Sequence, residues 1–97
     1  MSGINYVILD ILKPHQPSML ELGDAILKMG KDISVNLRLV EIDEKTETIA
    51  VIVKGSSISI AKIREEVEKM GGSIHSVDEV SMGKEAINSR DYSRISK

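Results

Sequence analysis

Residues 71–80 are Gly71-Gly72-Ser73-Ile74-His75-Ser76-Val77-Asp78-Glu79-Val80, and they end one helical pattern and begin the last extended one. Two successive glycines favour the end of a helix, and the β-branched run after them predicts a strand. This strand brings one histidine and two acids into the fold. Because first and last strands commonly pair in small α+β folds, we expect its neighbour to be the apolar run 4–12.

The segments before this stretch alternate between helical and extended hydrophobic patterns. Apolar residues recur every three or four positions in 19–29 and again in 60–70, which predicts two helices. Ser18 and Glu21 have the spacing of a capping box, and Ser59 is expected to cap the second helix. Residues 33–42 alternate apolar and polar side chains, and the polar turn 43–47 follows. Ile49, Val51 and Val53 continue the alternation, with Ala50 and Ile52 on the reverse face, which predicts the second strand of a hairpin.

The order strand, helix, strand, strand, helix, strand predicts one α+β domain. It is typical of the ferredoxin-like βαββαβ fold, with a four-stranded antiparallel sheet and two helices on one face. We assign this domain to residues 1–84. Residues 85–97 contain too few apolar side chains to offset the entropy lost on ordering, so we expect a polar, mobile C-terminal tail.

Composition argues against several classes of protein. Cysteine is absent, which removes disulfides, thiolate nucleophiles and sulfur-ligated metals. Phe and Trp are absent and the net charge is -2, so nucleic acid is not expected as a partner. No apolar run has the length of a membrane span, and no signal peptide or catalytic motif is found. We therefore predict a cytoplasmic protein without a membrane partner, and favour a binding role over an enzyme.

One edge of the predicted sheet is expected to gather basic and polar groups. We expect the first and third strands to end there, together with the N-termini of both helices. Helix N-termini offer free N–H groups beside these side chains, so the expected ligand is a small anion. The alternative is that the lysines are solvated turn residues and the histidines are structural. The anion-binding candidates are Lys13, His15, Lys54, Ser56 and His75.

The last strand also suggests a metal site. If Val77 faces the helices, Ser76 and Asp78 face the open side of the sheet, and antiparallel pairing places Asp10 opposite Ser76. Two carboxylates on a partly apolar face require a cation, and hard oxygen ligands favour Ca²⁺ or Mg²⁺. The alternatives are Arg38, solvated charge, or a salt bridge between subunits. The metal candidates are Asp10, Asp78 and Glu79, with Glu41, Asp43, Glu44 and Glu47 in the acidic hairpin.

Three segments carry a resemblance to a known family. They are residues 9–15, the hairpin pieces 41–43 and 46–47, and the last-strand motif 74–80 with Gly83. Over about residues 4–84 the chain resembles the archaeal family catalogued as domain of unknown function 211. The resemblance implies a ferredoxin-like subunit in a higher, ring-like homo-oligomer, with no established activity. The chain departs from that family in its polar tail and at Ser59, where relatives often carry an acid.

The leading functional hypothesis is a homo-oligomeric binding protein that senses a divalent cation or a small anion. An open sheet face that carries Tyr6, Ile8, Ile52 and Val80 is too apolar to leave in water, so we expect other copies to cover it. The second hypothesis is an effector-binding regulatory module that acts through subunit interfaces on binding a small ligand. RNA binding and metal-assisted hydrolysis are further alternatives.

Overall fold

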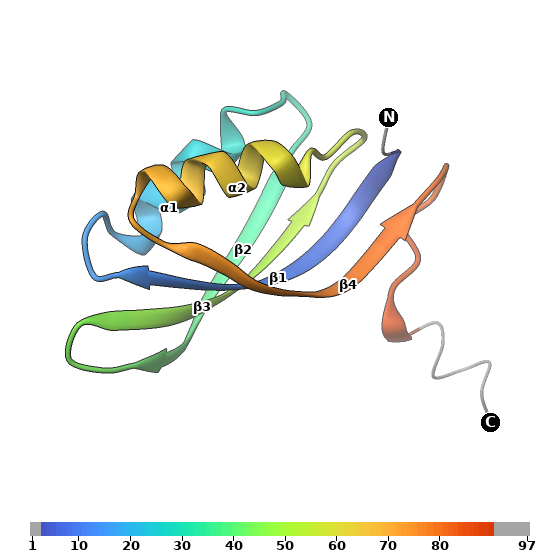
Figure 1. Cartoon of the computed structure of the whole chain (residues 1–97). Helices are drawn as coiled ribbons and strands as arrows, with labels where there is room; N and C mark the ends of the chain where they lie inside the picture. The colour runs from blue at the N-terminus through green and yellow to red at the C-terminus, as the bar shows by residue number, and fades with distance from the viewer. Residues whose placement is uncertain (1–2, 91–97) are drawn as a thin grey trace.

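The computed structural model describes residues 3–90 and confirms the predicted order of elements (Figure 1). Each strand is antiparallel to its neighbours in the sheet, and both helices pack on the same face. This is the ferredoxin-like βαββαβ fold. The elements are β1 (Ile4–Pro14), α1 (Met19–Leu27), β2 (Ser34–Ile42), β3 (Thr46–Lys54), α2 (Ile60–Lys69) and β4 (Ser73–Met82).

Local sequence signals fix the ends of the helices. The hydroxyl of Ser18 accepts from the N–H of Glu21 at 3.2 Å, and the Glu21 carboxylate accepts from the N–H of Ser18 at 2.9 Å, so the capping box is confirmed. The Ser59 hydroxyl accepts from the N–H of Lys62 at 3.2 Å, a cap that contributes about 1 kcal/mol. Gly71 follows α2 with φ of 82°, the left-handed conformation that glycine favours.

The core lies between the sheet and the two helices. Alternate residues of the two central strands point toward the helices and are buried, each contributing on the order of 2 kcal/mol by leaving water. None of the helices in residues 3–90 combines the length and apolar character needed to cross a membrane. The sheet contributes Val7, Leu9, Ile11, Ile49, Val51 and Val53 to this core, and the helices contribute Leu22, Ile26, Ile63 and Val67.

The pairing of β1 with β3 corrects one expectation. The two strands are antiparallel, so Lys13 lies opposite Glu47 whereas Lys54 lies opposite Tyr6. The expectation that both strands end at one edge was wrong, because adjacent antiparallel strands each begin where the other ends. The N-termini of α1 and α2 therefore lie at opposite ends of the sheet. We call these the His15 end, where β1 ends, and the Lys54 end, where β3 ends.

Three shifts in register interrupt the pairing of β4 with β1. Two of them leave His75 and Asp78 as extra residues on β4, and the third leaves Asn5 as an extra residue on β1. Each extra residue on β4 shifts the alternation of side-chain directions along β4 by one position. The residues that point to the helix side are therefore three apart in β4 rather than two. The expected direction of Val77 is thereby confirmed, whereas Val80, expected on the open face, also points to the helix side. These residues are Ile74, Val77 and Val80, opposite Ile11, Leu9 and Val7.

Residues 84–90 follow β4 and bind its open side. The N–H of Ile87 donates to the Ser81 hydroxyl at 2.9 Å, and the N–H of Ser89 donates to the Glu79 carboxylate at 2.9 Å. These bonds involve the first part of the predicted tail 85–97. Residues 91–97 lie outside the described part of the chain, and the mobility of the tail stays a prediction.

Candidate functional site

A row of charged and small residues crosses the open side of the sheet. Arg38 of β2 lies opposite Ala50 of β3, and Ala50 lies opposite Asp10 of β1. Asp10 in turn lies opposite Ser76 of β4, which confirms the predicted register at this point. The Ser76 hydroxyl donates to the Asp78 carboxylate at 2.7 Å. Ser76 therefore is bonded to Asp78 and lies opposite Asp10, the two acids that were expected to share this side of the sheet.

The two opposite charges in this row are not neutralised by pairing. Neither Asp10 nor Arg38 forms an ion pair within residues 3–90. Asp10 is half-buried, so its carboxylate is partly removed from the water that would otherwise stabilise it. Adjacent strands are about 4.8 Å apart, which places the Cα atoms of Asp10 and Arg38 roughly 10 Å apart across β3.

The predicted metal ligands do not converge on one point. No group of three or more His, Cys, Asp or Glu side chains in residues 3–90 has the geometry to hold a metal ion. Asp43 instead stabilises the hairpin turn, because its carboxylate accepts from the N–H groups of Lys45 and Thr46 at 3.3 Å each. These hydrogen bonds lower the pKa of Asp43. The Glu79 carboxylate binds the backbone that follows β4.

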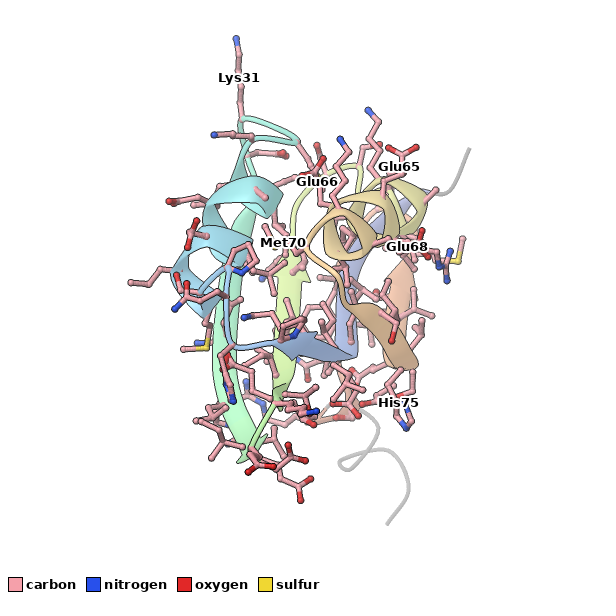
Figure 2. The ribbon with its side chains drawn as sticks, turned by 60° about the vertical axis from the view of Figure 1, so that its left-hand side comes forward. Lys31, Glu65, Glu66, Glu68, Met70 and His75 are labelled. Atoms are coloured by element: carbon pink, nitrogen blue, oxygen red, sulfur yellow. The ribbon has the colours of Figure 1, made fainter. Side chains whose placement is uncertain are left out.

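A shallow hollow of about 280 Å³ on the open side brings three predicted site residues together. Asp10, Glu41 and His75 line it, each from a different strand, with Leu12, Val40 and Thr48 between them. Figure 2 shows His75 at the rim of the molecule, on the side away from the helices. The hollow therefore gathers polar groups from β1, β2 and β4 without the convergence that a metal site requires.

At the His15 end, the ammonium group of Lys13 is taken up by internal bonds. Lys13 is 1% exposed, and its Nζ lies 3.3 Å from a carboxylate oxygen of Glu47. The same group donates to the carbonyl oxygens of Pro14, at 2.9 Å, and Pro17. These partners leave no ammonium donor for a bound anion, and the alternative of a solvated turn lysine is wrong as well. Lys13 lies opposite Glu47 because β1 and β3 are antiparallel, and this strand direction is what the sequence analysis missed.

His15 bonds to an acceptor through each of its ring nitrogens. Nδ1 lies 3.1 Å from the Glu47 carboxylate, and Nε2 lies 2.9 Å from the carbonyl oxygen of Asp43. Both partners only accept, so this geometry fits the doubly protonated imidazolium. The hydrogen bond with Glu47 raises the pKa of His15. Burial alone would raise the pKa of Glu47, but the hydrogen bonds from His15 and Lys13 together lower it.

Lys54 and Ser56 lie at the other end of the sheet, beside a pocket of about 420 Å³. Asn5, from the start of β1, and Lys84, from the segment after β4, line the same pocket. Sequence reasoning missed both, because Lys84 was placed at the domain boundary and Asn5 interrupts an apolar run. The five predicted anion ligands are thus divided between the two ends: Lys13, His15 and His75 at one, Lys54 and Ser56 at the other.

Comparison with known proteins identifies one family. Residues 5–94 match the model of the domain of unknown function 211 family, described as uncharacterized ArCR. The match continues past residue 84 and so includes most of the predicted tail. The chain is also similar to the uncharacterized protein MJ0319 of Methanocaldococcus jannaschii, with 39% identity over 87 residues, or 90% of each chain. On these matches the chain belongs to the domain of unknown function 211 family.

Proposed function

We propose that the protein is a homo-oligomeric binding protein whose subunits join through the open side of the sheet. The observation that carries the proposal is the pair of opposite charges, Asp10 and Arg38, left without ion-pair partners within residues 3–90. Half-buried apolar residues surround them on the two central strands. These are Tyr6, Ile8, Ala50 and Ile52.

A second copy of the chain complements this surface. Two open faces related by a twofold axis over Ala50 bring Arg38 of each copy toward Asp10 of the other, so that both charges are paired at once. The surrounding apolar side chains would then leave water together. This arrangement gives Asp10 and Arg38 the ion-pair partners that they do not have within residues 3–90 of one chain.

Both edge strands add exposed apolar surface, which supports an assembly larger than a dimer. The outer strand β2 exposes Leu39, Val40 and Ile42 to between 45 and 59%. The opposite edge is similar, since Val77, Val80 and Met82 of β4 are 44, 46 and 59% exposed. Different apolar surfaces on the two edges allow one subunit to contact two neighbours, as a closed ring requires.

Charge reversal tests the proposed interface. Asp10→Lys and Arg38→Glu should each weaken association, because each places like charges opposite one another across the interface. The double variant should restore association, since the pairs re-form with exchanged signs. Light scattering at matched micromolar concentrations measures the outcome, and circular dichroism verifies that each variant is folded.

Lys45→Glu is the matched control. Lys45 is exposed in the hairpin turn, so the same change of charge there should leave the mass unchanged. The interface is wrong if the folded double variant remains as dissociated as either single variant. It is also wrong if neither single variant changes the mass.

Sensing of Ca²⁺ or Mg²⁺ is a second proposal. It is supported by the row of Asp10, Ser76 and Asp78, which brings two carboxylates to the same side of the sheet. Calorimetry should then show binding of Ca²⁺ or Mg²⁺ to the assembled protein that Asp10→Asn and Asp78→Asn each abolish. Loss of binding in Asp10→Asn and Asp78→Asn, with binding by Asp43→Asn equal to that of the unchanged protein, would support a cation site in this row. The absence of saturable heat with the unchanged protein would refute it.

A further inference from the structure

The pocket at the Lys54 end is built from four separate segments of the chain. They are the start of β1, the loop before β2, the loop after β3 and the turn after β4, which the antiparallel sheet brings to one end (Figure 1). The N–H of Gly55 donates to the Asn5 carbonyl at 3.1 Å, and the N–H of Gly83 donates to the Gly3 carbonyl at 3.0 Å. The walls are therefore tied to the sheet by backbone bonds rather than formed by one loose loop.

Asn5 supplies a buried polar group beside this pocket. Its side chain is 7% exposed, and its Nδ2 donates to the carbonyl oxygen of Gly83 at 2.7 Å. Its Oδ1 accepts no hydrogen bond within residues 3–90. A buried oxygen without a donor costs about 1 to 3 kcal/mol.

The charges of the pocket favour an anion. Lys54 and Lys84 are both exposed at its rim, and neither forms an ion pair within residues 3–90. The acid of the pocket, Asp32, already accepts from the N–H of Ser56 at 2.9 Å. The hydroxyl and N–H of Ser56 lower the pKa of Asp32, so it is ionised at neutral pH. Two lysines against one engaged carboxylate leave one excess positive charge.

We infer that this pocket binds a small organic anion through an oxyanion group, a carboxylate or a phosphate, held between Lys54 and Lys84. The Ser34 hydroxyl also lines the pocket and supplies a further donor to the same oxygens. The volume of about 420 Å³ accommodates an anion larger than free phosphate. This inference deepens the binding part of the proposed function and does not depend on how subunits assemble.

Calorimetric titration of the full chain with inorganic phosphate and with citrate, each at constant ionic strength, tests the inference. Saturable heat with either probe is the expected result, and the stronger probe identifies the phosphate or the carboxylate as the preferred group. Lys54→Ala and Lys84→Ala should each weaken binding by roughly three- to fivefold, the size expected for an exposed charge pair. Asp32→Asn should strengthen it by about twofold, because a like charge is removed while an acceptor for Ser56 remains.

Lys45→Ala is the matched control, since it removes an equally exposed lysine at the far end of the sheet. The pocket is refuted if neither probe gives saturable heat, or if Lys45→Ala weakens binding as much as Lys54→Ala does. Light scattering on the same samples separates the two proposals. A monomer that binds with the expected lysine dependence refutes assembly alone, whereas an assembled protein without saturable binding refutes the pocket alone.

Discussion

The two ends of the sheet hold similar side chains in opposite states. At the His15 end, Lys13 and His15 are bonded to Glu47 and to backbone carbonyl groups. At the Lys54 end, Lys54 and Lys84 line a pocket and form no ion pair within residues 3–90. The first group is therefore part of the structure, whereas the second is free to bind.

The difference arises from the position of one acid. Glu47, the second residue of β3, lies directly opposite Lys13 and is 11% exposed, so it replaces the water that a buried ammonium loses. At the other end the acid that lines the pocket, Asp32, accepts a hydrogen bond from the N–H of Ser56. A lysine near a turn thus becomes structural or functional according to its partner across the sheet, and not according to its own neighbours in sequence.

Removing the buried lysine should give the largest effect. Lys13→Met keeps most of the side-chain volume but leaves the Glu47 carboxylate without its ammonium partner, which should lower the free energy of unfolding by about 4 kcal/mol. Lys54→Met should change it by less than about 0.5 kcal/mol, because Lys54 is exposed and unpaired. Urea unfolding of both variants measures the contrast, and similar losses would show that the two ends do not differ as described.

The glycines near the two ends should also respond differently. A Cβ atom at Gly72 would lie 2.5 Å from the carbonyl oxygen of Leu12 and 2.9 Å from Cβ of Lys13. Gly72→Ala should therefore cost about 3 kcal/mol through displaced backbone. Gly83→Ala meets nothing within 4 Å and should cost only about 1 kcal/mol, from its φ of 110°. A smaller loss for Gly72→Ala than for Gly83→Ala would disprove the close contact with β1.

The smallest expected effect is a pH dependence confined to the His15 end. The folded pKa of His15 is raised above 6.5, so its stabilising contribution is complete below pH 6.5 and is lost as the pH rises through the folded pKa. The melting temperature should therefore fall above pH 6.5, and His15→Gln should reduce that fall. His75→Gln is the control, because His75 forms no ion pair within residues 3–90. An unchanged slope in His15→Gln would contradict the assignment.

The same network has a second limit at low pH. The pKa of Glu47 is lowered from 4.5, so its contribution is present above pH 4.5 and is lost as the pH falls through the folded pKa. The network should therefore stabilise the fold most between pH 4.5 and 6.5, where both partners are charged. Glu47→Gln should flatten the stability profile below pH 4.5, which melting curves in acidic buffers would show.

The fold was predictable because its signals are local. The spacing of apolar residues gave the order of elements, and the capping box of Ser18 and Glu21 marked the start of α1. Even the direction of Val77 followed from the cost of burying Asp78. The bulges at His75 and Asp78 were not predictable, because they depend on pairing with β1 and have no local sequence signature.

The candidate sites were harder to predict because they are made of distant residues. Lys13 and Glu47 are far apart in sequence, and only the direction of β3 relative to β1 places them together. The wrong direction merged the two ends into one anion site. The pocket at the Lys54 end further requires Asn5 and Lys84, which come from opposite ends of the chain. The row from Arg38 to Ser76 was predicted in part, since Asp10 was correctly placed opposite Ser76.

The most direct test of the account is the mass of the protein in solution. If other copies of the chain cover the open side and pair with Asp10 and Arg38, as we propose, light scattering at micromolar concentration should give a multiple of the 10.7 kDa chain mass. The mass should fall in high salt, because screening weakens the charge pairs across the interface. A mass of 10.7 kDa at low salt and micromolar concentration would contradict the account.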